Sequence, residues 1–237
     1  MTGPHPLDNP VRSSLLGPHK RFAERHGTAL RYPAEVVPFA ALPTDPDPAD
    51  WADLAALAGP GAVVALAGER APAPDGWESS LIGEGVQMTG DDVAGAEPDD
   101  DVVRLGPADV PEMLELTART KPGPFLARTI ELGLYLGIRR GGALVAMAGE
   151  RMRPAGWTEI SAVCTDDAWR GHGFAGRLIR VLAATVQARG DVPFLHAVAT
   201  NTGAIRLYEA LGFRVRQQTV FRRVQVPAEQ RAGSLTD

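Results

Sequence analysis

The feature that most constrains this chain is the segment WTEISAVCTDDAWRGHGFAGRL at residues 157–178. Its pattern predicts a strand, a short turn, a glycine-rich loop and then a helix that begins near residue 174. That order aims the unpaired backbone N–H groups of the loop, together with the positive end of the helix dipole, at one point. Gly171 and Gly173 allow the backbone to turn tightly and to approach a ligand without a Cβ in the way. The segment therefore predicts a phosphate-binding site.

Bulk properties narrow the class of protein. The chain has 237 residues, which is enough for one large domain or two small ones. No stretch approaches the roughly 18 apolar residues that span a bilayer, and the first ten residues lack the pattern of a signal peptide. The single cysteine, Cys164, excludes an internal disulfide and a zinc site built from cysteines. We therefore expect a cytosolic (cytoplasmic) protein with no metal and no membrane partner.

The charge is distributed unevenly along the chain. Residues 1–101 contain 6 Lys and Arg against 17 Asp and Glu, whereas residues 102–237 contain 18 against 12. The positive half also carries the glycine loop, which favours a small polyanionic ligand there. An acidic linker that skews the count is the alternative explanation. Because there is no basic stripe with interleaved aromatic residues and the pI is near 5.6, no nucleic-acid partner is expected.

An acidic stretch at residues 90–101, GDDVAGAEPDDD, has almost no large apolar side chains and predicts a flexible boundary between two units. We expect an N-terminal domain over residues 1–99 and a C-terminal domain over residues 100–237. Prolines concentrate in the first of these, with 13 of 20 before residue 102.

The two units share a repeated sequence. GAVVALAGER at 61–70 and GALVAMAGER at 142–151 are identical at eight of ten positions, and Pro-x-Gly-Trp follows each at 74–77 and 154–157. We interpret the N-terminal unit as a truncated copy of the C-terminal one, with a matching hairpin over 61–78 and 142–159. Chance similarity between alanine-rich strands is the alternative. The first copy has no glycine loop, so it is not expected to hold phosphates.

Hydrophobic periodicity and turn residues predict the order of elements. Helices are expected over residues 49–59, 108–119, 124–132, 174–189 and 202–211. Strands are expected over residues 61–67, 102–105, 134–140, 143–153, 157–165 and 194–199, with a strand pair over 213–226. Helices packed on a mixed sheet follow, because one face of each strand needs cover.

The loop also matches G-x-G-x-x-G, the dinucleotide-binding fingerprint, between Gly171 and Gly176. The match is weak, because five residues separate the strand from the first glycine. Asn201, not an acidic residue, follows the next strand, and only about 60 residues remain after the loop. Nicotinamide or flavin binding is therefore disfavoured.

Read as Arg170-x-x-Gly173-x-Ala175, the loop resembles the acetyl-CoA-binding loop of the GNAT superfamily of N-acetyltransferases. The stretch from Asn201 to Phe213 is similar to that superfamily's segment N-x-x-A-x-x-L-Y-x-x-x-G-F. The resemblance is close over 157–226 and loose over 102–156, and the whole chain resembles the FR-type, glycine-acyltransferase-like branch. It implies an α/β (α+β) GNAT fold, a mixed, mostly antiparallel sheet flanked by helices, with an N-terminal degenerate repeat of related fold.

The resemblance implies acetyl-CoA as the cosubstrate. The loop N–H groups would bind its pyrophosphate, and the pantetheine arm would pair with the end of strand 157–165 where that strand parts from its neighbour. Asn201 is expected as a helix N-cap, as a pantetheine ligand, or as both, and His172 receives no catalytic role. The expected cofactor-binding residues are Val163, Cys164, Thr165, Arg170, Gly171, His172, Gly173, Phe174, Ala175, Gly176 and Asn201.

Tyr208 is expected to be the general acid that protonates the departing thiolate, with an aromatic residue at the core edge as the alternative. Glu159 is the first candidate for the general base and Glu150 the second, while exposed strand-end carboxylates are the alternative for both. Alternation along the strand places Glu159 on one face with Val163, and Cys164 on the opposite face. Cys164 is expected to be a buried small residue, not a nucleophile.

These features predict an acyltransferase that moves an acetyl group from acetyl-CoA to a primary amine by direct attack and therefore with sequential kinetics. The acceptor is expected to be a small-molecule or peptide amine, and the N-terminal unit and the loop at 120–125 are expected to shape its site. A homodimer is left open as a partner. The alternative is a non-catalytic CoA-sensing or regulatory module that keeps the loop without the chemistry.

Overall fold

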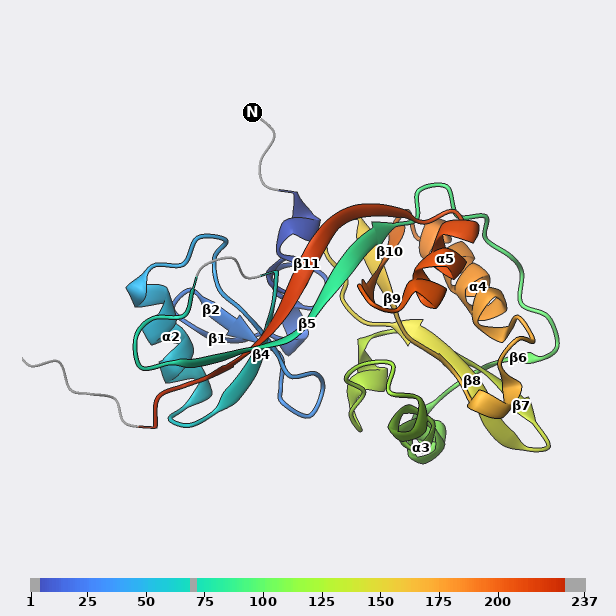
Figure 1. Cartoon of the computed structure of the whole chain (residues 1–237), viewed down its shortest axis with the longest axis horizontal. Coiled ribbons are helices and arrows are strands. Elements are labelled where there is room, and N and C mark those ends of the chain that lie inside the picture. The colour runs from blue at the N-terminus through green and yellow to red at the C-terminus, as the bar shows by residue number, and fades with distance from the viewer. Residues whose placement is uncertain (1–4, 69–71, 229–237) are drawn as a thin grey trace, which may run out of the picture.

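The computed structural model describes residues 5–68 and 72–228 of the chain. In these residues eleven strands form one continuous sheet, in the order β1-β2-β3-β4-β11-β5-β10-β9-β8-β7-β6. One end of the sheet is built from the first part of the chain and the other end from the second part, and a long twisted ribbon of β5 and β11 joins them (Figure 1).

The part of the sheet that carries the glycine loop follows the sequence expectation closely. Neighbouring strands are antiparallel except β9 and β10, which are parallel. The mixed, mostly antiparallel sheet flanked by helices is therefore confirmed. The strands are β6 (Val102–Arg104), β7 (Tyr135–Arg140), β8 (Ala143–Glu150), β9 (Trp157–Thr165) and β10 (Val192–Val198).

Helices cover both faces of this part of the sheet. Helix α3 (Val110–Thr120) lies on one face, and α4 (Phe174–Ala188) and α5 (Thr202–Ala210) lie on the other (Figure 1). α4 has an apolar stripe at helical spacing, and Leu178 and Leu182 of this stripe are fully buried. Because that stripe faces the sheet, the start of the helix is held at the end of β9, where the loop delivers the chain.

The first part of the chain forms the other end of the sheet. Its strands are β1 (Glu24–His26), β2 (Ala29–Arg31), β3 (Phe39–Ala41) and β4 (Val63–Ala67), and its helices are α1 (Pro10–Leu16) and α2 (Pro48–Ala58). Asp47 caps α2 by accepting hydrogen bonds from the backbone N–H groups of Ala49 and Asp50. Trp51 and Leu54 of α2 then pack on β4, as the expected helix and strand required.

The ribbon of β5 (Glu78–Thr89) and β11 (Arg214–Gln225) corrects two expectations. The expected strand pair at 213–226 is a single strand, whose partners β4 and β5 come from the first part of the chain. The hairpin expected at 61–78 is also wrong, because β11 lies between β4 and β5, whereas β8 and β9 pair directly. The repeated sequences therefore sit in different surroundings. The residues before and after the predicted boundary near residue 99 contribute strands to the same continuous sheet.

Two connecting segments also differ from expectation. The helix expected at 124–132 is reduced to a single 3-10 turn at Thr129–Leu132. The acidic stretch at 90–101, expected to be a flexible linker, lies as a strap along α4. The backbone N–H of Ala96 donates to the carbonyl of Arg180 at 3.1 Å, and a Cβ at Gly95 would lie 2.7 Å from the Ala184 side chain.

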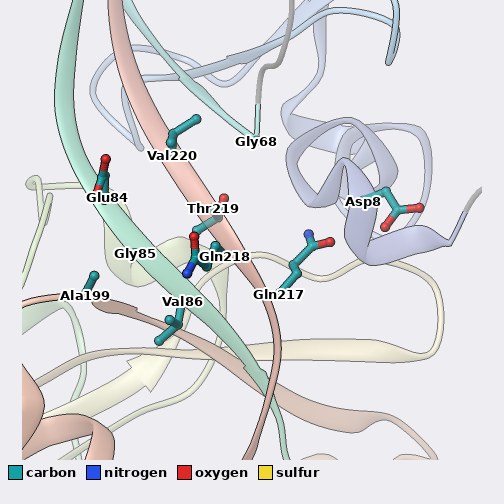
Figure 2. Close-up of a pocket in the computed structure, with 10 residues that line it drawn as sticks. All are labelled: Asp8, Gly68, Glu84, Gly85, Val86, Ala199, Gln217, Gln218, Thr219 and Val220. Carbon is teal, nitrogen blue, oxygen red and sulfur yellow. The ribbon is translucent and has the colours of Figure 1, made fainter.

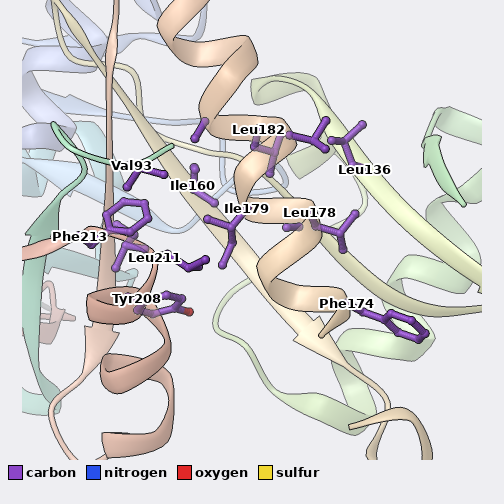
Figure 3. Packing of buried hydrophobic residues seen from close by; sticks show 14 of the residues in the cluster. Val93, Leu136, Ile160, Phe174, Leu178, Ile179, Leu182, Tyr208, Leu211 and Phe213 are labelled. Atoms are coloured by element: carbon purple, nitrogen blue, oxygen red, sulfur yellow. The ribbon is translucent and has the colours of Figure 1, made fainter. Parts of the chain in front are cut away.

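The largest core cluster lies between α4, α5 and the sheet (Figure 3). Ile160 of β9 and Leu178, Ile179 and Leu182 of α4 form its centre. Tyr208 and Leu211 close it on the α5 side, where Phe213 packs edge-on against Tyr208 with ring centroids 6.1 Å apart. This cluster fixes α5 against α4 and so determines where the Tyr208 side chain lies.

Candidate active site

The glycine loop has the geometry that the sequence predicted. Gly171 and Gly173 have φ angles of 82° and 75°, in the region that favours glycine, and Gly173 is the N-cap of α4. No heavy atom lies within 4 Å of a Cβ built at either glycine. Their freedom is therefore used to set the backbone turn, which leaves the space above the loop open.

The loop presents a row of backbone donors. Within the part of the chain that the structure describes, none of the N–H groups of residues 171–176 donates a hydrogen bond to the protein. These donors sit at the positive end of the 15-residue helix α4. Oxygen atoms of a diphosphate satisfy such donors and are attracted by the dipole, so the residues present fit the predicted phosphate group.

The side chains of the loop support this backbone without filling it. Arg170 pairs with Asp167 at 2.7 Å, and both side chains are exposed. The His172 Nδ1 atom lies 3.1 Å from the carbonyl oxygens of Trp169 and Arg170, so its ring is held against the backbone of the loop. Phe174 is buried and stacks on Trp169, so its contribution to a ligand site is its backbone N–H.

Two arginines flank the start of α4 beside Phe174. The guanidinium of Arg140 lies 4.9 Å from the centre of the Phe174 ring and that of Arg177 lies 5.8 Å away. The acidic strap neutralises both, since Asp101 pairs with Arg140 at 2.8 Å and Arg177 binds Asp99 and Asp101. Hydrogen bonds from these arginines lower the pKa of both aspartates. The acidic stretch at 90–101 thus offsets part of the net positive charge of residues 102–237.

Strands β9 and β10 separate beside the loop. Their last paired residues are Glu159 and Phe194, although both strands continue beyond this point. The expected parting of the strand from its neighbour is therefore confirmed. Just after the separation β9 is irregular, since its register with β8 shifts and Ala162 takes a φ angle of 52°. Such a bulge takes backbone groups out of the ladder.

The bulge overturns the expected alternation of side chains on β9. Ile160 and Val163 both pack in the cluster under α4, whereas Ala162 and Cys164 pack in the cluster under α3. Cys164 is therefore on the same face as Glu159, and Val163 is on the opposite one. Cys164 is buried, and burial raises the pKa of its thiol to about 11. It is a core residue, as expected.

Tyr208 and Asn201 lie where α5 meets the open end of β9. Burial, with a smaller effect from Cys164, raises the pKa of Tyr208 to about 12, so the phenol keeps its proton at neutral pH. Tyr208 packs in the same core cluster as Val163, which belongs to the separated part of β9. The Asn201 side chain accepts a hydrogen bond from the N–H of Ala204 at 3.1 Å, which confirms the N-cap.

Glu159 is not an exposed carboxylate. It is fully buried, and Arg151 binds it with two hydrogen bonds at 2.7 and 2.8 Å. The Nδ1 atom of His196 and the N–H of Met152 bind the same carboxylate at 2.7 and 3.2 Å. Burial alone raises the pKa of Glu159, but the charge and hydrogen bonds of Arg151 and the bond from His196 outweigh it and lower the pKa to about 2. This geometry argues against the expected role of Glu159 as the general base.

The second candidate base is also engaged. Glu150 is buried on the α4 face of the sheet, where Arg189 binds its carboxylate at 2.8 Å. Neither carboxylate is therefore the exposed strand-end group that was the alternative expectation. Both carboxylates are buried and paired with an arginine, and they lie close together because Glu150 of β8 is opposite Ile160, the neighbour of Glu159 on β9.

His196 was missed from the sequence. Its Nδ1 bridges the separating strands to Glu159, and its Nε2 lies 3.2 Å from the side-chain nitrogen of Gln87 on β5. Gln87 in turn accepts a bond from Arg216, which pairs with Asp8. Only alternation along β10 could have drawn attention to His196, and no signal in the sequence pairs it with Gln87, which is 109 residues away.

A cavity of about 270 Å³ lies along the shared ribbon (Figure 2). Glu84 and Val86 of β5 border it on one side, Gln217 and Thr219 of β11 on another, and Asp8 closes it from the N-terminal segment (Figure 2). Any molecule that binds there contacts both parts of the chain.

Comparisons with known proteins agree with the fold and the loop. The FR47-like protein family matches residues 135–222. A solved structure from Novosphingobium aromaticivorans, described as an acetyltransferase of the GNAT family, is 41% identical over 93% of this chain and 98% of its own, with a TM-score of 0.85. A GCN5-related N-acetyltransferase from Kribbella flavida shares the fold, with 19% identity, a TM-score of 0.62 and coverage of 92% of this chain and 95% of its own. No curated protein matches the chain.

The chain therefore belongs to the GNAT family of acetyltransferases. The GNAT fold and the family resemblance expected from the two motifs are both confirmed, and the FR-type branch is compatible with the family match. Membership supports acyl transfer as the general activity. In the residues that the structure describes, no helix has the length and apolar character needed to cross a bilayer.

Proposed function

We propose that this protein transfers an acetyl group from acetyl-CoA to a primary amine of a small molecule or peptide. The observation that carries the proposal is the row of unpartnered N–H groups at residues 171–176, placed at the start of α4 and next to the separated strands β9 and β10. The pyrophosphate would be held by these N–H groups, and the pantetheine arm by the backbone of residues 163–165. Asn201, already the cap of α5, is the further expected contact of that arm.

The proposed reaction is direct attack. The amine nitrogen bonds to the thioester carbonyl carbon, the π electrons move to oxygen, and an N–H of β9 near Val163 or Thr165 stabilises that oxygen. When the C–S bond breaks, Tyr208 gives its proton to the sulfur and regains one from water. Because Glu159 and Glu150 are both ion-paired, the proton that the amine loses passes to water. The products are an N-acetyl amide and CoA.

Calorimetry and thiol release test this proposal together. Acetyl-CoA is expected to bind and NAD is not, and CoA release is expected only with an acceptor amine present. A burst of CoA without any amine would contradict direct attack. Binding of acetyl-CoA with no release across an amine panel would favour the alternative, a CoA-sensing module. Absence of heat with both CoA and acetyl-CoA would refute the proposal.

A further inference from the structure

One buried polar atom is left without a partner. Among the side chains that the structure describes, the hydroxyl of Tyr135 on β7 is the buried nitrogen or oxygen atom that makes no hydrogen bond. The residue is only 1% exposed. Leaving a buried hydroxyl unpaired costs about 1–3 kcal/mol, so such a group in a folded protein calls for an explanation.

The Tyr135 ring lies across β8 toward the irregular part of β9. A Cβ built at Gly149 of β8 would lie 2.2 Å from the Tyr135 ring, so only glycine leaves room for the ring there. Gly149 pairs on its other side with Ser161, the residue before the bulge at Ala162. The ring therefore lies over β8 on the α3 face, and the β9 partner of Gly149 is two residues past Glu159, the last residue of β9 that pairs with β10.

The loop on that face holds the ring in place. Phe125 packs edge-on against Tyr135, with ring centroids 5.5 Å apart and an angle of 72° between the planes. Met147 and Cys164 complete the same cluster. Tyr135 is thus fixed between β9 and the loop at 120–125, which the sequence had associated with the acceptor side.

Neither member of the Arg151–Glu159 pair accepts a hydrogen bond from the Tyr135 hydroxyl. Arg151 only donates hydrogen bonds, and the two oxygens of Glu159 already accept four. Burial raises the pKa of Tyr135 above its usual range, so the group is a hydrogen-bond donor over the whole working range of pH. A ligand group that pairs with this hydroxyl must therefore bring an acceptor atom. An attacking amine does not supply one, because its lone pair forms the new bond.

We propose that the Tyr135 hydroxyl donates a hydrogen bond to the carbonyl oxygen of the acyl group, as a second donor beside the N–H groups of β9 at the bulge. This inference rests on the proposed function. During attack the carbonyl oxygen gains negative charge, and it loses that charge when the C–S bond breaks. A donor that is already buried and fixed stabilises the charge without reorganisation. Tyr135 is then a catalytic residue that also distinguishes acylated CoA from free CoA.

The test is Tyr135→Phe, with Tyr32→Phe as the matched control. Tyr32 is equally buried, but its hydroxyl lies 2.9 Å from Nδ1 of His19. Removal of the Tyr135 oxygen breaks no bond within the protein, so the melting temperature is expected to stay the same or rise. Tyr32→Phe is expected to lower it and to leave ligand binding unchanged.

Calorimetry with acetyl-CoA and with CoA gives the second readout, which needs no acceptor. In Tyr135→Phe the ratio of the two dissociation constants is expected to shift against acetyl-CoA by about fivefold to tenfold, with CoA affinity unchanged, as loss of one neutral hydrogen bond requires. With an active amine, kcat is expected to fall 10- to 100-fold at constant KM for the amine.

An unchanged ratio in Tyr135→Phe would overturn the inference, and so would a drop in melting temperature as large as that of Tyr32→Phe, because the hydroxyl would then be structural. These outcomes are distinct from failure of the proposed function. If the wild-type protein bound neither CoA nor acetyl-CoA, both the proposed function and the inference would be overturned, whatever the variants did.

Discussion

Replacing Glu159 by Gln isolates the buried ion pair at the centre of the site. The carboxylate accepts two bonds from Arg151 and one each from His196 and Met152. A Gln side chain places an NH₂ group against donors and leaves the buried guanidinium without its counter-charge. Breaking one side of a buried pair costs about 3–5 kcal/mol. The same charge and hydrogen bonds from Arg151 hold the pKa of Glu159 well below its usual range, which is the direction expected of a stabilised carboxylate.

The assay is thermal unfolding of wild type and variant by calorimetry at pH 7. For a chain of this size, 1 kcal/mol shifts the melting temperature by about 2–4 °C, so Glu159→Gln is expected to lower it by about 6–20 °C. Glu131→Gln is the control, because Glu131 binds Arg128 at 2.6 Å with both side chains exposed, and water already screens that pair. The double variant Arg151→Met/Glu159→Met removes both charges and is expected to recover part of the loss.

The pH dependence gives an independent check with a defined sign. Because folding lowers the pKa of Glu159, its stabilising effect is fully present above about 4.5 and is lost as the pH falls toward about 2. The difference in unfolding free energy between wild type and Glu159→Gln should therefore shrink over that window. Equal melting temperatures for Glu159→Gln and Glu131→Gln would refute the reasoning. A fully stable Glu159→Gln variant that lost the acidic limb of its pH–rate profile would instead restore Glu159 as the general base.

Three further predictions test separate parts of the site. Gly173→Ala places a Cβ at a φ of 75° and is expected to destabilise the fold by roughly 1–2 kcal/mol. It is also expected to weaken acetyl-CoA binding in calorimetry at least tenfold. The control Gly190→Ala, at a φ of 81° beyond the other end of α4, should lose a similar amount of stability and keep its affinity for acetyl-CoA. Tyr208→Phe is expected to lower kcat roughly 100-fold with little change in acetyl-CoA affinity, and unchanged turnover would remove Tyr208 as the acid. Ala162→Val puts a β-branched residue at a φ of 52° and is expected to lower the unfolding free energy in urea by about 1–3 kcal/mol, while Ala162→Gly should not; equal values for the two would mean that the bulge is unstrained.

The residues that were predictable from sequence are those whose structure is set by their neighbours in the chain. The turn at Gly171 and Gly173 and the cap at Asn201 each follow from a few adjacent residues, and both appear where they were expected. The strands from β6 to β10 were predictable for the same reason, because each reads as a local run of strand-forming residues bounded by turns. The bulge at Ala162 was not, since alanine at positive φ has no signature in the sequence Ser-Ala-Val-Cys.

The remaining errors have one physical origin, which is that a strand pattern does not name its partner. β11 reads locally like half of a hairpin, yet it pairs with β5 and β4 from the opposite end of the chain. Similarly, Glu159 reads as one polar residue on a strand, and only the fold brings Arg151 and His196 to it. The exposed strand-end carboxylate that was the alternative to a general base is therefore replaced by a buried ion pair.

The ribbon of β5 and β11 brings the first part of the chain next to a candidate site whose motifs all lie in the second part. β5 occupies the position beside β10, and its Gln87 donates to Nε2 of His196, whose Nδ1 binds Glu159. Gln87 is itself oriented by Arg216 of β11 and by the carbonyl of Leu7. A continuous series of hydrogen bonds thus runs from the N-terminal segment to the point where β9 and β10 separate. Gln87 and Glu159 in this series are buried, so loss of the N-terminal contact leaves the polar side chain of Gln87 without one of its partners. The N-terminal part is therefore a structural component of the candidate site, even though the motifs of that site all lie in the second part of the chain.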